Sequence, residues 1–297
     1  MIVTVARTLA RKVLFAPLPL LALLVLVELA LRAAPDAIAA YSRLTTRLRP
    51  DATTYIVTMG DSVTAGSRLA EGASWPAQLR GLYRAEGQSS VEVVNTAISG
   101  SRMRDIEGRQ VRWLENVPAG SNLVVLLLAT HNDFSQWMSA TEYMAKSGAG
   151  TGVGEESNLR VFNVVQWLFA GSRAHASLDA SAETWLVREL TTMKAAVAER
   201  GGTLYVLTYA IPGPAESLPM RLTLGEYDDY RSYAHRTNRM LVRAAYAVGA
   251  RTMDLEAELP VPVTFDPDFW IDTVHFTEKG SAAVAKHVRE ELREDGF

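Results

Sequence analysis

The sequence predicts a three-layer α/β domain with about five parallel strands, and three observations support this prediction. Short apolar runs alternate with segments of helical periodicity along most of the chain, as in doubly wound α/β proteins. The run at 122–130, NLVVLLLAT, is almost unbroken in valine and leucine, as expected of a strand covered on both faces. Hydrophobic residues make up 48% and charged residues 21% of the 297 residues, a globular balance that excludes a disordered chain.

The segments that predict strands share a short length and a high content of Val, Ile, Leu, Thr or Tyr. They lie at 54–59 (TYIVTM), 91–98 (VEVVNTAI), 122–130 (NLVVLLLAT), 203–210 (TLYVLTYA) and 251–255 (RTMDL). The predicted helices lie between or after these strands and end at glycine or proline where the sequence provides one. They run from Ser74, a candidate N-cap, to Gly87; at about 102–115; from about Ser181 to Gly201; at about 228–248; and after Glu278.

Residues 134–180 interrupt this alternation as a long insertion between the third strand and its helix. The insertion contains a flexible patch, SGAGTGVGEES, and a segment, VFNVVQWLFAG, whose apolar residues repeat at helical spacing. We favour an additional helix packed on the core. The alternative is a lid or a binding element that faces the site or a membrane, because long loops in compact domains often have such roles.

The N-terminal residues 1–35 form a separate unit. Three basic residues among the first 12 precede an apolar run from Val13 to Leu31, in which Glu28 is the one charged residue. A helix needs about 20 apolar residues to span a bilayer, so we favour an uncleaved membrane anchor. The alternative is a cleaved signal peptide, for which an Ala-x-Ala motif at 37–39 is the nearest cleavage site.

These features divide the chain into an anchor or signal peptide (1–35), an arginine-rich linker (36–53) and the α/β domain with its insertion (54–297). We expect the domain to be exported, periplasmic or extracellular, and attached to the membrane by the N-terminal helix, or secreted if that helix is cleaved. A net charge of −3 gives no electrostatic basis for binding nucleic acid. No pattern in the sequence specifies an oligomeric state.

Metal and thiol chemistry have no support in the composition. Cysteine is absent, which excludes disulfides, thiolate metal sites and a cysteine nucleophile. The five histidines are dispersed and no HExxH motif is present, so we expect neither a metal nor a cofactor.

Candidate functional residues follow the predicted strands, because chemistry in an open parallel sheet gathers at the carboxyl ends of its strands. These residues are Gly60-Asp61-Ser62 after the first strand, Ser99-Gly100 after the second, Asn132-Asp133 after the third, and Asp272 and His275 after the fifth. They share the hydroxyl, imidazole, carboxylate and amide groups that nucleophilic catalysis by serine requires.

The mechanism that fits these groups begins with Ser62. Its hydroxyl is a weak nucleophile until a base removes the proton, and a neutral His275 imidazole is such a base near pH 7. Asp272, three residues before His275, is placed to hold the ring in the required tautomer. The oxyanion formed on a carbonyl needs preorganised donors, for which we propose the Ser62 N–H, the Gly100 N–H and the Asn132 side-chain amide. We predict a distance of about 2.6–3.2 Å between the Ser62 hydroxyl and the His275 ring.

Four stretches resemble the characteristic blocks of the SGNH, or GDSL, hydrolases: GDSVTAG at 60–66, NTAISG at 95–100, THND at 130–133 and DTVHFTEKG at 272–280. Their order and spacing match over roughly residues 54–290. The resemblance implies a flavodoxin-like SGNH fold and a serine esterase or lipase that needs no metal or cofactor. It places Ser62, Asp272 and His275 in the triad, and Ser62, Gly100 and Asn132 in the oxyanion hole.

One position departs from the pattern of this family. The third block usually reads Gly-x-Asn-Asp, and Thr130 holds the position of the glycine. A threonine there alters the backbone that leads to Asn132 or narrows the pocket.

Other residues in the blocks have alternative interpretations. We expect Asp61 and Asp133 to bond loop N–H groups, and Gly60 and Gly66 to leave room around the serine. His131 either lines the pocket or lies on an exposed loop. Three further histidines, His175, His235 and His287, are assigned to structure, and the stretch FDPDFW at 265–270 forms either a wall of the site or a hydrophobic plug.

The resulting functional expectation is a serine ester hydrolase that acts through an acyl-serine intermediate on carboxylic esters. The substrates would be lipid acyl esters or O-acetyl-carbohydrate esters of the cell envelope. The alternatives are an acyltransferase with the same triad, and a catalytically weak glycan-binding module in envelope polysaccharide modification.

Overall fold

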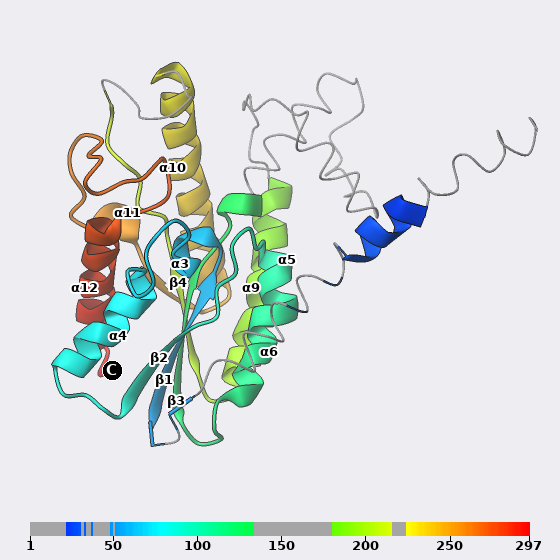
Figure 1. Cartoon of the computed structure of the whole chain (residues 1–297), viewed down its shortest axis with the longest axis vertical. Coiled ribbons are helices and arrows are strands. Elements are labelled where there is room, and N and C mark those ends of the chain that lie inside the picture. The colour runs from blue at the N-terminus through cyan, green and yellow to red at the C-terminus, as the bar shows by residue number, and fades with distance from the viewer. Residues whose placement is uncertain are drawn as a thin grey trace, which may run out of the picture.

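The computed structural model describes residues 22–30, 33, 37, 48–49, 51–133, 180–215 and 224–297, and the last three ranges form the α/β domain. Its five parallel strands are ordered β2-β1-β3-β4-β5 (Figure 1). They are β1 (Thr54–Gly60), β2 (Val91–Asn95), β3 (Asn122–Leu128), β4 (Thr203–Leu207) and β5 (Arg251–Met253). This strand order is that of flavodoxin-like sheets, so the predicted fold class is confirmed.

Helices cover both faces of the sheet (Figure 1). On one face lie α4 (Trp75–Ala85) and α12 (Glu278–Glu294). On the other lie α9 (Ala180–Ala198), α10 (Leu224–Ala247) and a helical stretch over residues 103–116. Alternate residues of β1 enter the two cores: Tyr55 and Val57 pack on the α9 side and Ile56 on the α4 side. This burial on both faces explains the unbroken apolar strands in the sequence.

The candidate site lies where β1 and its two neighbours, β2 and β3, end. The register of β1 aligns Gly60, its last residue, with Leu128, the last residue of β3. On the other side Thr58 aligns with Asn95, where β2 ends. The segments that follow β1, β2 and β3 therefore leave the sheet at the same edge, where the short helix α3 (Ser62–Ala65) begins.

The helical stretch at 103–116 changes its winding in the middle. It consists of α5 (Met103–Asp105), the π-helical turn η1 (Ile106–Gln110), α6 (Val111–Trp113) and the 3₁₀ turn η2 (Leu114–Asn116). The buried amide of Gln110, at the end of the π turn, accepts from the Gly60 N–H and donates to the Gly60 carbonyl, both at 2.8 Å. A π turn inside a helix is often found at a functional site, and here it fixes the end of β1.

Several predicted boundaries differ from the observed ones because side chains turn the chain earlier. The second strand ends at Asn95, whose Oδ1 accepts from the Ala97 N–H at 3.1 Å. The fifth ends at Met253, since the next residue, Asp254, caps α11 (Leu255–Glu258). Ser74 is the N-cap residue of α4, but its side chain makes no capping hydrogen bond, and Pro76 at the second helical position has no N–H to donate.

The N-terminal prediction is only partly covered by the structure. Residues 22–30 are helical and carry exposed leucine and valine side chains. In the part of the chain that the structure describes, no helix is both long and apolar enough to cross a membrane. Most of the predicted linker (36–53) and residues 134–179 of the predicted insertion lie outside the described residues.

Candidate active site

The candidate nucleophile begins a short helix directly after β1, an interior strand of the sheet. Ser62 is the first residue of α3, and the N-cap Asp61 accepts from the Val63 N–H at 3.0 Å. Gly66 ends the helix in the left-handed conformation, with φ of 75°. The backbone of α3, and with it the position of Ser62, is thus held at both ends of the helix.

The glycines around Ser62 are closely packed against other parts of the chain. A Cβ on Gly60 would clash with the carbonyl oxygen of Leu128, and a Cβ on Gly66 would clash with Ser74. Both glycines therefore make room for neighbouring protein atoms. The prediction that they leave room for the serine to meet a substrate stays a prediction.

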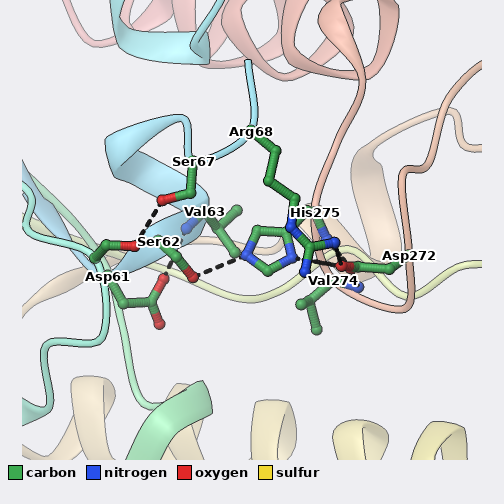
Figure 2. Close-up of polar contacts among 9 residues, drawn as sticks. Asp61, Ser62, Val63, Ser67, Arg68, Asp272, Val274 and His275 are labelled. Carbon is green, nitrogen blue, oxygen red and sulfur yellow. Dashed lines mark hydrogen bonds and ion pairs between the residues drawn. The ribbon is translucent and has the colours of Figure 1, made fainter.

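A chain of hydrogen bonds joins Ser62, His275 and Asp272 (Figure 2). The Ser62 Oγ lies 2.9 Å from His275 Nε2, which confirms the predicted distance. The other ring nitrogen, Nδ1, lies 2.9 and 2.8 Å from the two carboxylate oxygens of Asp272. This arrangement assigns the proton to Nδ1 and leaves Nε2 to accept the serine proton.

Asp272 is buried and remains ionised. The backbone N–H groups of Val274 and His275 donate to its Oδ1 at 3.0 and 2.8 Å. Burial acts to raise the pKa of Asp272, but the hydrogen bonds from the His275 ring and the two N–H groups outweigh it and lower the pKa to about 2. The carboxylate can therefore stabilise an imidazolium throughout the neutral range.

Arg68 also contacts the triad, and sequence reasoning missed it. Its Nη1 donates to Asp272 Oδ2 at 2.8 Å, and Figure 2 shows the side chain reaching toward Asp272 beside the His275 ring. Arg68 follows Ser62 by six positions and has a left-handed backbone, with φ of 71°. The available signal was a basic residue within the nucleophile block, but sequence spacing alone cannot pair it with a residue 204 positions away.

A tyrosine after β4 also joins the site and was not predicted. The Tyr209 hydroxyl donates to Asp61 Oδ2 at 2.6 Å. Burial raises the pKa of Asp61 to about 6, although the bonds from Tyr209 and the Val63 N–H act to lower it. The expectation that Asp61 bonds a loop N–H is confirmed, and Tyr209 adds a second anchor for the nucleophile turn. Tyr209 was missed because the predicted strand at 203–210 included it, whereas β4 ends at Leu207.

The loop after β3 is tied to the loop after β2. The Asn132 side-chain amide donates to the Ser101 carbonyl at 3.0 Å, and Asp133 Oδ2 accepts from the Met103 N–H at 3.0 Å. The predicted role of Asp133 in bonding a loop N–H is thereby confirmed. Asn132 and the Ser101 carbonyl thus connect the two candidate oxyanion-hole loops directly.

Gly100 lies in the loop after β2 with φ of 77°, and a Cβ there would meet no atom within 4 Å. The positive φ, and not a lack of space for a side chain, therefore explains why glycine occupies position 100. Within the described part of the chain, neither the Ser62 N–H nor the Gly100 N–H donates a hydrogen bond. The roles of Ser62, Gly100 and Asn132 in an oxyanion hole stay predictions.

Thr130 adopts the backbone conformation of the glycine that it replaces. Its φ is 98°, and its side chain is fully buried. The Thr130 hydroxyl has no hydrogen-bond partner among the described residues. A positive φ is a genuine outlier for a β-branched residue. The backbone before Asn132 therefore has a glycine-like conformation that carries steric strain.

His131 lies beside the triad, which supports the first of its two interpretations. Its ring packs against Tyr209 and Tyr230, with centroid separations of 5.8 and 6.1 Å. Burial, together with the nearby His275, lowers the pKa of His131 to about 4. Its imidazole is therefore neutral at pH 7.

The remaining residues singled out in the sequence lie outside the triad. Phe269 and Trp270, from FDPDFW, pack with Phe276 in the core, as expected of the plug. His235 pairs with Glu256, and His175 lies outside the described residues. Among the described residues, the group that could hold a metal ion is Glu258, His287 and Glu291, whose ligand atoms lie within 4.8 Å of one another. None of these three residues belongs to the triad.

The fold and these hydrogen bonds define an α/β protein with a Ser–His–Asp triad at the carboxyl edge of its sheet. Residues 58–283 match the model of the GDSL-like lipase/acylhydrolase family, and the chain belongs to that family. Among curated proteins, none matches the chain.

Solved structures with a similar fold include an extracellular lipase from Streptomyces rimosus, with a TM-score of 0.51 and 17% identity over 80% of this chain and 99% of that one. An acetylxylan esterase from Geobacillus stearothermophilus gives a TM-score of 0.50 and 16% identity over 84% and 97% of the two chains. A lipolytic G-D-S-L protein from Veillonella parvula gives 0.50 and 13% over 81% and 98%. At these identities the likeness shows the shared fold.

Proposed function

We propose that the protein is a serine ester hydrolase that forms an acyl-serine intermediate on Ser62. The observation that carries this proposal is the unbroken hydrogen-bonded chain from Ser62 Oγ through His275 to Asp272. Membership of a lipase/acylhydrolase family supports it. The chemistry requires a nucleophile, a base and a carboxylate that orients the base, and these three side chains supply them.

The reaction follows from the geometry. His275 Nε2 takes the Ser62 proton while the serine oxygen attacks the ester carbonyl, and Asp272 stabilises the imidazolium that forms. The negative oxygen of the tetrahedral intermediate would be held by N–H donors of Ser62 and Gly100 and by the Asn132 amide. The intermediate expels the alcohol, which takes the proton from His275. A water molecule, deprotonated by His275, then releases the carboxylic acid and restores Ser62.

The substrate class that we propose is an ester of the cell envelope, either a lipid acyl ester or an O-acetyl group on a carbohydrate. The apolar run from Val13 to Leu31 supports a location at a membrane. We propose that the α/β domain lies on the exported side. The solved structures of similar fold include both a lipase and an acetylxylan esterase, and fold alone does not choose between such substrates.

The test compares the full-length protein with Ser62→Ala on p-nitrophenyl acetate. We expect Ser62→Ala to lower kcat/KM by at least about 10³-fold. Ser67→Ala is the matched control, because Ser67 lies just after the same helix and contacts Ser99 instead of the triad. It should stay within about threefold of the wild type. Equal, poor turnover by wild type and Ser62→Ala over a broad ester panel would exclude the hydrolase and leave the acyltransferase and the glycan-binding module.

A second experiment separates the substrate classes with p-nitrophenyl esters from acetyl to palmitoyl. A strict acetyl preference would favour carbohydrate O-acetyl esters, and a rise in kcat/KM with chain length would favour lipids, since each buried methylene adds to binding. Addition of an acceptor glycan, with detection of acetyl transferred to it, tests for an acyltransferase.

A further inference from the structure

The contacts around the triad form a closed ring, and Arg68 completes it. Ser62 contacts His275, His275 contacts Asp272, and Asp272 contacts Arg68. Ser62 and Arg68 in turn belong to one short segment, the turn that contains α3. The same segment therefore contacts the triad at two points. Ser62 contacts the base, His275, and Arg68 contacts the carboxylate of Asp272.

The backbone of Arg68 suggests that its position is functionally constrained. Its φ of 71° is the left-handed conformation, which is uncommon for a residue with a side chain. A strained conformation persists when the surrounding structure determines it, and such residues cluster at active sites. Here the left-handed residue carries a guanidinium whose Nη1 lies 2.8 Å from the buried carboxylate of Asp272.

We propose that Arg68 is a positioning residue that offsets part of the negative charge of Asp272 and so sets the lower pH limit at which His275 can act as the base. The catalytic part of this inference rests on the proposed function, ester hydrolysis through Ser62. A carboxylate next to an imidazole favours the imidazolium, and a cation on the far side of that carboxylate weakens the effect. With Arg68 present, His275 therefore stays neutral, and able to accept the Ser62 proton, down to a lower pH than it would without Arg68.

Other groups around His275 do not replace this charge. Besides Asp272, two described titratable groups interact electrostatically with His275: Asp61 at the end of β1 and His131 after β3. Asp61 is an acid, which favours the imidazolium when ionised, and His131 is neutral near pH 7. Both are unchanged when Arg68 is replaced, so a comparison of variants isolates the arginine.

The test measures the dependence of kcat/KM on pH in the full-length protein and in Arg68→Met. The acid limb should move to higher pH, on the order of half a unit because the ion pair is partly exposed and screened. At the alkaline plateau, activity should stay within about tenfold of the wild type, since two backbone N–H groups still hold Asp272. Arg68→Lys keeps the charge and should lie closer to the wild type than Arg68→Met does.

The matched control is Arg243→Met. Arg243 pairs with Glu183 at 2.7 Å and has a side chain 58% exposed, against 61% for Arg68, but it contacts no triad residue. Its acid limb should coincide with that of the wild type. If Arg68→Met lowered activity equally at every pH, or if Arg68→Lys shifted the limb as far as Arg68→Met, the proposal would be overturned.

A measurement without substrate separates this inference from the proposed function. The His275 ring can be titrated by NMR, with its signals identified by their loss in His275→Asn. In Arg68→Met the midpoint should rise by the same amount as the acid limb. If no ester were hydrolysed but the midpoint still rose, the enzymatic proposal would fail and the electrostatic role of Arg68 would stand. An unchanged midpoint would contradict the role of Arg68 whatever the activity.

Discussion

The turns after β1 and β3 leave the sheet side by side, yet they reach their backbone conformations in different ways. At the β1 turn, glycine is required by space, because a Cβ on Gly60 would clash with the Leu128 carbonyl. At the β3 turn, Thr130 takes a φ of 98° with its side chain fully buried. The same edge of the sheet therefore contains two kinds of position. Packing requires glycine at position 60, whereas position 130 has a glycine-like backbone but holds a threonine under steric strain.

Among the substitutions that test this comparison, Gly60→Ala should lower the stability of the protein most. The added methyl group would meet the Leu128 backbone and the Thr64 side chain, and neither has a flexible end that can move away. We expect the free energy of unfolding to fall by about 3 kcal/mol or more, as for severe overpacking. Urea denaturation, with ester hydrolysis as a second readout, measures the loss.

The matched control for that change is Gly72→Ala, where the new Cβ would meet nothing within 4 Å although φ is also positive, at 85°. It should cost only about 1 kcal/mol, the strain of a left-handed alanine. If both variants lost equal stability, the close approach to Leu128 would not be the reason for glycine at position 60.

Asp133→Asn tests the carboxylates that anchor the two turns. Burial raises the pKa of Asp133 to about 7, despite the bond from the Met103 N–H. An acid whose pKa is raised on folding stabilises the fold fully below its unfolded pKa, and this contribution is lost as pH rises through the folded pKa. Between pH 4.5 and pH 8 the wild type should therefore lose about 3 kcal/mol more than Asp133→Asn, whose amide oxygen still accepts from Met103.

Urea denaturation of both proteins at the two pH values measures this difference. If the stability gap between wild type and Asp133→Asn were the same at pH 4.5 and pH 8, Asp133 would not be a buried carboxylate that opposes folding when ionised. The result would then place the loop after β3 in a more solvated environment than that around Asp61.

The sequence predicted much of the fold because the sheet is buried on both faces. The apolar run of β3 and the alternation of strands and helices reflect that burial directly. Strand ends were predicted less well, since Asn95 and Asp254 turn the chain through their own side chains, a local effect that apolar periodicity does not register.

The triad was predictable because its chemistry demands particular side chains in particular blocks. Asp272 and His275 lie three positions apart, so the local turn brings them together, and the strand order brings Ser62 to them. Arg68 and Tyr209 were missed since their partners are determined by tertiary packing: neither the arginine nor the tyrosine has a sequence pattern that identifies a distant carboxylate as its partner.

Thr130 gives the smallest and most specific prediction, a reversal of the usual order of alanine and glycine. Both Thr130→Ala and Thr130→Gly remove the buried hydroxyl that lacks a partner among the described residues, and both remove the methyl group. They differ in whether the backbone can adopt a φ of 98° without strain. We therefore expect Thr130→Gly to be more stable than Thr130→Ala by about 1 kcal/mol, although glycine normally destabilises a chain through its entropy. Thermal unfolding of the two variants measures the difference. Greater stability of Thr130→Ala would show that the turn relaxes away from the glycine conformation once the threonine is removed, and that the threonine, through its packing, had itself held the backbone before Asn132.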